Sequence, residues 1–185
     1  MINDNNSQFD RLVSIIEKLR AKDGCPWDRE QTHESLKKAC LEEAAEVVCG
    51  INIFTDTGNA DNLREELGDL LLQVVMHAQI AKEEGLFTME DVCRDIADKM
   101  VRRHPHVFPV QDDEISNALT AAPDKVTTAD QVLANWDEIK KVEHKSDDLD
   151  VNTYLFKAFD ESKELIDAAI KRKKEKFCPA DQSTQ

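Results

Sequence analysis

Residues that interrupt helices are scarce in this sequence. Its 185 residues include only 5 glycines and 5 prolines, so few turns are expected. Aromatic residues make up 5% of the chain, and β-branched and aromatic residues rarely alternate with polar ones. The pattern therefore argues against sheets and predicts an all-α fold made of long helices.

Lysine and arginine are also few. There are 24 of them against 38 aspartates and glutamates, which gives a formal net charge of −14. Such a chain repels a phosphate backbone, so we expect no nucleic-acid partner. A nucleotide can still bind, provided that a metal ion bridges it to the acidic side chains.

Paired cysteines and long apolar runs are missing. None of the five cysteines forms Cys-x-x-Cys, which argues against a zinc site or a redox pair. An odd, scattered set of cysteines, with no apolar signal core in Met1–Ser7, fits a reducing compartment. No run approaches the roughly 20 apolar residues of a membrane span. We therefore expect a cytoplasmic protein without a membrane partner.

Apolar spacing and the turn residues between apolar segments predict six helices. They cover residues 7–21, 29–54, 61–84, 88–103, 128–144 and 153–177. A long loop is expected over 104–127, where three prolines stand. We place one domain at 7–144, a C-terminal helical extension at 145–178, and a disordered tail at 179–185.

Two pairs of carboxylates on neighbouring predicted helices carry most of the chemical information. Glu43 and Glu46 are three residues apart, and so are Glu66 and Asp69. Residues at this spacing share one helix face, so each helix offers a pair of acids. Two such helices packed side by side give an all-oxygen cluster, which suits Mg²⁺, with Mn²⁺ as the alternative ion.

The second acidic pair stands in an unusual setting. Leucine and valine cover nearly the whole circumference of helix 61–84, which is typical of a buried helix, yet Glu66, Asp69, Gln73 and His77 follow one flank. Buried carboxylates must pair, bind metal or stay protonated, and several together repel one another without a cation. The alternative is a solvated acidic face with ordinary salt bridges, which is common in a chain with 34% charged residues. A di-iron centre would need a second Glu-x-x-His motif, which the sequence lacks.

Two further pairs lie downstream at i,i+4 spacing: Lys99 with Arg103, and Trp136 with Lys140. Taken alone, they fit a solvated basic face and a core tryptophan. Beside an acidic metal site, they fit a phosphate grip and a contact to a base or phosphate. The basic tract 171–176 is expected to be a solvated helix face.

Several motifs occur in a characteristic order along the chain. They are Gly24-Cys25-Pro26-Trp27-Asp28, Gln31-Thr32-His33, Leu41-Glu42-Glu43-Ala44-Ala45-Glu46, Arg64-Glu65-Glu66-Leu67-Gly68-Asp69-Leu70-Leu71, Arg102-Arg103-His104-Pro105-His106-Val107-Phe108 and Asn135-Trp136-Asp137-Glu138-Ile139-Lys140. With this set, the chain resembles the MazG family of nucleoside triphosphate pyrophosphohydrolases over roughly Phe9 to His144. The resemblance implies an all-α, MazG-like helical bundle whose four-helix units assemble by dimerisation, as a homodimer or higher homo-oligomer. It also implies Mg²⁺-dependent hydrolysis of nucleoside triphosphates (NTP and dNTP) to monophosphate and pyrophosphate, as housecleaning of the nucleotide pool.

The resemblance further implies a role for each residue at a matching position. The metal ligands are Glu43, Glu46, Glu66 and Asp69, the accessory acids for a second ion or the attacking water are Glu42 and Glu65, and the nucleotide contacts are Lys99, Arg103, Trp136 and Lys140. Asn62 stands where some members carry lysine, so one phosphate contact is missing or is supplied by Arg64. Trp27 and His33 belong to the motifs without an assigned chemical role, and we expect them to pack at a helix entry.

A second class of function stays open at this point. The chain would then be a non-catalytic acidic helical module that mediates interactions or binds nucleotide. Such a module explains the composition, but it does not explain acids on an otherwise apolar helix or the ordered motifs. A member that has lost its activity is a third alternative, against which the retained carboxylates argue.

Overall fold

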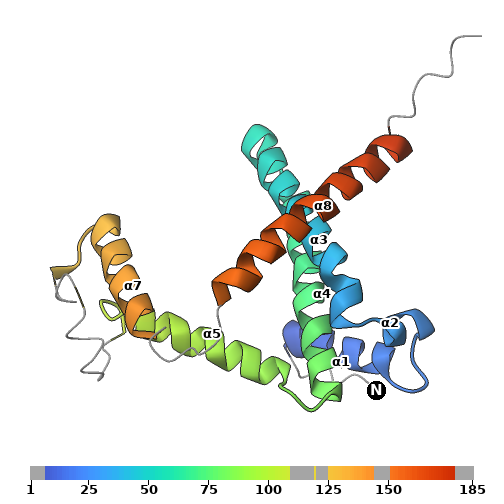
Figure 1. Ribbon diagram of the computed structural model, residues 1–185, viewed down its shortest axis with the longest axis horizontal. Helices are drawn as coiled ribbons and strands as arrows, with labels where there is room; N and C mark the ends of the chain where they lie inside the picture. The colour runs from blue at the N-terminus through green and yellow to red at the C-terminus, as the bar shows by residue number, and fades with distance from the viewer. Residues whose placement is uncertain (1–6, 109–118, 120–124, 144–150, 178–185) are drawn as a thin grey trace, which may run out of the picture. The chain divides into compact units, whose positions relative to one another are not determined.

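The computed structural model describes residues 7–108, 119, 125–143 and 151–177, and every regular element among them is a helix. The helices are α1 (Gln8–Arg20), α2 (Pro26–Glu30), α3 (His33–Thr57), α4 (Asp61–Glu83), α5 (Met89–Arg103), α7 (Ala129–Glu143) and α8 (Val151–Phe177) (Figure 1). The all-α prediction is confirmed. Five of the six predicted helices agree with the structure to within two residues at each end.

The second predicted helix, 29–54, differs from the structure at both ends. The chain breaks before α3 because Thr32 is extended (φ −124°, ψ 167°) and caps the new helix, its hydroxyl accepting a hydrogen bond from the backbone N–H of Ser35. The Ser35 hydroxyl in turn accepts one from the N–H of Thr32 at 3.0 Å. Residues 26–30 therefore form the separate helix α2. At the other end, α3 continues to Gly58, whose positive φ of 75° stops it.

The chain divides into two compact units. One comprises residues 1–89 together with 152–185, and the other comprises residues 90–151. Helix α8 thus belongs to the same unit as α3 and α4, although the sequence predicts it as an extension. The junction predicted at 144/145, most of the predicted loop and the predicted disordered tail lie outside the described residues, so the domain boundaries stay a prediction.

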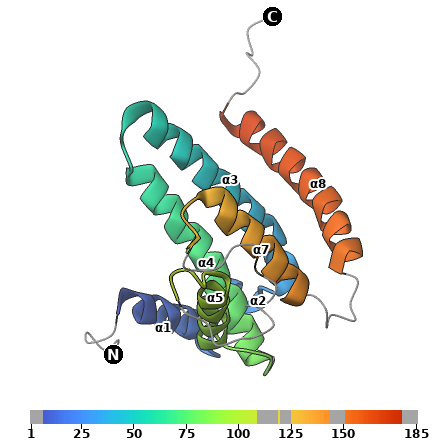
Figure 2. The ribbon, with the colours of Figure 1, turned by 90° about the vertical axis from the view of Figure 1, so that its left-hand side faces the viewer.

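Helices α3 and α4 form a hairpin, with α1 packed against one end of it (Figure 2). The core of this unit forms where the three helices meet. Its buried side chains are Ile16 of α1, Leu36 of α3, and Val75, Met76 and Ile80 of α4. The hairpin is therefore anchored through the second half of α4 and the beginning of α3.

The two hairpin helices approach closely at Gly50. A β-carbon at this buried position would lie 2.8 Å from Cα and 3.0 Å from the backbone nitrogen of Leu63. No real side chain fits at such a distance, so glycine is what permits the approach. Gly50 lies one turn after Glu46, and Leu63 lies one turn before Glu66. The close approach therefore brings the acidic segments of the two helices together.

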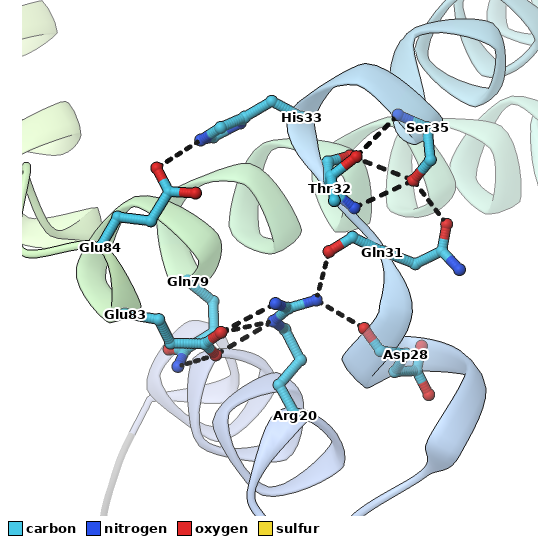
Figure 3. A network of polar contacts seen from close by, with 9 residues as sticks. All are labelled: Arg20, Asp28, Gln31, Thr32, His33, Ser35, Gln79, Glu83 and Glu84. Atoms are coloured by element: carbon cyan, nitrogen blue, oxygen red, sulfur yellow. Dashed lines mark hydrogen bonds and ion pairs between the residues drawn. The ribbon is translucent and has the colours of Figure 1, made fainter.

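Arg20, the last residue of α1, contacts both the α2 segment and the end of α4 (Figure 3). Its guanidinium donates to the carboxylate of Glu83, with Nη2 2.7 Å from Oε2, and also to the carbonyl oxygens of Asp28 and Gln31. Its side chain is only 5% exposed. Gln79 donates to the same carboxylate at 2.9 Å. This network holds α2 and the residue that follows it against the C-terminal part of α4.

The prediction that helix 61–84 is buried all round is confirmed only in part. Most side chains between Gln73 and Ala81 are buried, but Leu67 (50%), Leu71 (37%) and Val74 (40%) of α4 are exposed. On α3, Val48, Ile51 and Phe54 are also exposed. We call these six residues the exposed apolar set. The expectation of all-round burial is thus wrong for the single chain, because the helices of this unit do not cover these side chains in the described structure.

Two predicted absences can be compared with the described residues. None of their helices combines the length and apolar character that crossing a bilayer requires. The four described cysteines are all unpaired thiols.

Candidate metal centre

The hairpin brings together carboxylates from both of its helices. One carboxylate oxygen each from Glu43, Glu46 and Glu66 lie within 4.8 Å of one another. All three residues are partly buried. The two acids of α3 are one turn apart, and the third comes from the facing segment of α4. We call these three residues the acidic cluster.

Glu43 lies in surroundings that disfavour the charged form of its carboxyl group. Burial raises the pKa of its carboxyl group, and repulsion from Glu46, Asp69, Glu66 and Glu42 raises it further. Asp69 is therefore close enough to act on Glu43, although it lies outside the group of three oxygens. A divalent cation in the cluster would relieve both effects, because it favours the charged form of each carboxyl group.

The two accessory acids occupy different positions. Glu42 is partly buried and lies 4.0 Å from the ammonium of Lys38, whereas Glu65 is exposed. The Asn62 side-chain amide donates a hydrogen bond to Oε1 of Glu66 at 2.8 Å. The asparagine thus orients a cluster carboxylate. The predicted roles of the two accessory acids stay predictions.

A histidine pair lies farther along the same flank of α4. The Nδ1 atoms of His33 and His77 are 2.7 Å apart, and the two rings stack at an interplanar angle of 3°. The Cys40 sulfur lies 3.3 Å from Nε2 of His77. Burial lowers the pKa of His77, and His33 adds to this effect. The sequence assigned no chemical role to His33. Trp27 was expected to pack at a helix entry, but it is 63% exposed.

The residues present fit a hard divalent ion. The cluster offers carboxylate oxygen, the ligand type of Mg²⁺ and Mn²⁺. Gln73, one turn from Asp69, has a buried side-chain oxygen for which the described residues supply no hydrogen-bond partner. The two imidazoles of the histidine pair contact each other through their Nδ1 atoms.

The predicted nucleotide contacts belong to the other unit. Within it, Arg103 donates to the carboxylate of Glu143 from both Nε (3.0 Å) and Nη2 (2.5 Å). Lys140 lies 3.4 Å from Asp137 on its own helix, and Lys99 is partly buried on α5. The structure therefore shows Arg103 and Lys140 in ion pairs, and the role of these three residues in nucleotide binding stays a prediction.

Trp136 packs against an imidazole in the same unit. Its ring meets that of His104 edge-on, with centroids 5.0 Å apart and an interplanar angle of 89°. Its indole N–H is buried and has no hydrogen-bond partner among the described residues. The packing fits the core-tryptophan interpretation, whereas the unpaired donor fits a ligand contact, so both interpretations stay open.

Helix α8 reaches the acids of α3, which the sequence did not indicate. Arg172 pairs with Glu42, and Lys173 pairs with Glu46. Both side chains are exposed, as a solvated face requires, but the sequence did not predict these ion pairs. No local pattern signals the contacts, because the partners are 130 and 127 positions apart.

Comparison with known proteins identifies a family model that matches part of this chain. The model of the MazG nucleotide pyrophosphohydrolase domain matches residues 31–108, which contain the acidic cluster and both accessory acids. The chain carries a MazG domain. The matched range includes Lys99 and Arg103, but it leaves out α7 and α8.

Several curated relatives are similar to this chain over longer stretches. A nucleoside triphosphate pyrophosphohydrolase/pyrophosphatase MazG of Thermotoga maritima is 59% identical over 100 residues, which are 54% of this chain and 38% of the relative. A nucleoside triphosphate pyrophosphohydrolase of Escherichia coli is 44% identical over 138 residues, 74% of this chain and 46% of the relative. The uncharacterised protein YabN of Bacillus subtilis is 47% identical over 136 residues, 74% of this chain and 24% of the relative. This chain thus spans about half, or less, of the length of these relatives.

Proposed function

We propose that this protein hydrolyses nucleoside triphosphates, both NTP and dNTP, to nucleoside monophosphate and pyrophosphate. The observation that carries the proposal is the convergence of Glu43, Glu46 and Glu66 within a MazG domain. The names of the relatives from T. maritima and E. coli support it. We assign the activity to the cytoplasmic nucleotide pool.

The proposed metal is Mg²⁺, with Mn²⁺ as a substitute. Glu43, Glu46 and Glu66 would hold it, with Asp69 as the fourth ligand. When bound, the ion neutralises charge that develops on the phosphate oxygens during phosphoryl transfer. Because Glu43 binds a proton more readily than an ordinary glutamate, protons and metal compete for this carboxylate.

The accessory acids would handle the water. We propose that Glu65 or Glu42 orients a water molecule and accepts its proton as the oxygen attacks the α-phosphorus. The bond from that phosphorus to the α–β bridging oxygen then breaks, and pyrophosphate leaves with the electron pair. Lys99, Arg103 and Lys140 are the proposed contacts to the phosphates, and Trp136 is the proposed contact to the base.

We also propose that the protein works as a homodimer or a higher homo-oligomer. The exposed apolar set on α3 and α4 supports an assembly of this kind. Exposed apolar side chains mark interaction sites in soluble proteins where they form a contiguous patch. A second hairpin packed on it would complete a four-helix unit.

Product analysis tests the activity. The protein is incubated with each common NTP and dNTP, with Mg²⁺ and with EDTA, while nucleotides, pyrophosphate and phosphate are quantified. We expect monophosphate and pyrophosphate in equal amounts, and no turnover with EDTA. Diphosphate plus phosphate would contradict the proposed bond cleavage. No turnover of any nucleotide would favour the non-catalytic helical module.

A further inference from the structure

A groove lies between α3 and α8. Helix α8 crosses α3 in Figure 1 and runs beside it in Figure 2. It encloses a cavity of about 360 Å³. Its apolar walls include Leu41 and Ala45 from α3, and Leu165, Ala169 and Ile170 from α8. This volume lies within the roughly 300 to 1,000 Å³ of small-molecule sites, which are typically lined by apolar side chains and a few polar groups.

The groove is continuous with the acidic cluster. Glu46 belongs to both, and Glu42 also lines the groove. Lys173, another lining residue, pairs with Glu46, while Arg172 pairs with Glu42. A small apolar space, two cations and the candidate metal ligands therefore adjoin one another.

The two cations are able to exchange partners. The side chains of Arg172 and Lys173 are 46% and 53% exposed, so their charged ends can reorient without unfolding α8. A divalent ion bound by Glu46 removes much of the charge that attracts Lys173. A triphosphate on that ion then presents new anionic oxygens, and the planar guanidinium of arginine matches phosphate in a two-bond geometry.

We infer that α8 forms one wall of the nucleotide site, where Arg172 and Lys173 bind the triphosphate and the apolar groove holds the nucleoside. The inference rests on the proposed function and deepens it. Helix α8 lies outside the residues matched by the family model, so the match does not assign it. In this arrangement the groove, rather than Trp136, contacts the base, and the contacts that it offers are mainly aliphatic.

Binding of a non-hydrolysable triphosphate tests the role of the two cations. Titration calorimetry with Mg²⁺ compares the wild-type protein, Arg172→Gln/Lys173→Gln, and the control Lys157→Gln/Lys163→Gln. The control makes the same change of charge elsewhere on α8. We expect binding to weaken roughly tenfold or more in the first variant, because two charge-assisted contacts are lost, and to stay near wild type in the control. Arg172→Lys/Lys173→Arg, which keeps both charges, should recover part of the affinity.

Alkylation of Cys49 reports on the groove without reference to catalysis. Its thiol lines the cavity and is exposed. Peptide mapping after iodoacetamide treatment measures its rate of modification separately from the other cysteines. Mg²⁺ with the non-hydrolysable triphosphate should slow this reaction in the wild-type protein and in the control, and should slow it much less in Arg172→Gln/Lys173→Gln.

Three outcomes overturn the role of α8. One is unchanged affinity in Arg172→Gln/Lys173→Gln while the wild-type protein hydrolyses nucleotides. A second is tighter binding of Mg²⁺ or nucleotide in that variant, which would make α8 a cover that competes with the metal. The third is unprotected Cys49 in a nucleotide-saturated wild-type protein. Absence of both binding and turnover in the wild-type protein overturns the proposed function itself, so the two failures are distinguishable.

Discussion

At the scale of single residues, the fold places Glu43 where its negative charge is unfavourable. Its carboxyl group is partly desolvated and faces the acids of both hairpin helices, so its pKa lies above the ordinary value of 4.5. A raised acid pKa means that the ionised group costs stability. This cost is fully present above the raised pKa and disappears as the pH falls toward 4.5.

Glu43→Gln should therefore stabilise the metal-free protein while abolishing metal-dependent turnover. The amide removes the charge that the other carboxylates repel. Thermal unfolding in EDTA should show a higher Tm for the variant at neutral pH, and the difference should shrink as the pH approaches 4.5. Both proteins carry the same other titratable groups, such as His77, so the contributions of these groups cancel in the difference between the two Tm values. A lower Tm for the variant at neutral pH would contradict the electrostatics of the cluster.

Glu66 contributes the cluster oxygen from the second helix, and Asn62 holds its carboxylate. Glu66→Gln keeps the shape but removes a charged ligand, so we expect kcat to fall by about two orders of magnitude or more. Circular dichroism should show unchanged helix content. Glu164→Gln, an exposed glutamate on α8, is the matched control and should keep wild-type kcat. Near-normal turnover in Glu66→Gln would disprove the ligand assignment.

At the scale of elements, the separation of α3 and α4 decides whether the acids can share an ion. Gly50→Ala places a methyl group 2.8 Å from the Leu63 backbone, which forces the helices apart. We expect a loss of about 1 to 3 kcal/mol in the free energy of unfolding, together with weaker metal binding. Urea unfolding and Mn²⁺ titration measure the two effects.

Gly68→Ala is the control for this substitution. It also lies within the hairpin, on α4, but nothing stands within 4 Å of its added β-carbon. Alanine favours a helix over glycine by about 1 kcal/mol, so this variant should be more stable than wild type. Equal effects of the two substitutions would mean that the close approach at Gly50 is not what positions the helices.

The helices and the acidic cluster were predictable because their signals are local. Apolar spacing marks each helix, and the three-residue interval within Glu43–Glu46 sets a shared face. The break before α3 was missed because Ser35, rather than glutamate, completes the cap of Thr32. The contacts of Arg172 and Lys173 were missed because they depend on how α8 folds back, which side-chain pattern alone does not encode.

At the scale of the whole molecule, the exposed apolar set predicts self-association. Leu67 and Leu71 are one turn apart on α4, and both are exposed in the single chain. Leu67→Gln/Leu71→Gln should shift the protein toward monomer, because polar side chains remove the apolar contact. Sedimentation velocity measures the distribution. Leu86→Gln, at a 66% exposed leucine after α4, is the control and should leave it unchanged. A monomeric wild-type protein would contradict the proposed assembly.

The central claim is that this protein holds a divalent ion on its acidic cluster and directs water to the α-phosphorus of a nucleoside triphosphate. Hydrolysis with Mg²⁺ in oxygen-18 water, followed by mass spectrometry of both products, tests it most directly. The account predicts the heavy oxygen in the nucleoside monophosphate and none in the pyrophosphate. Heavy oxygen in the pyrophosphate would place the attack on the β-phosphorus and contradict the account.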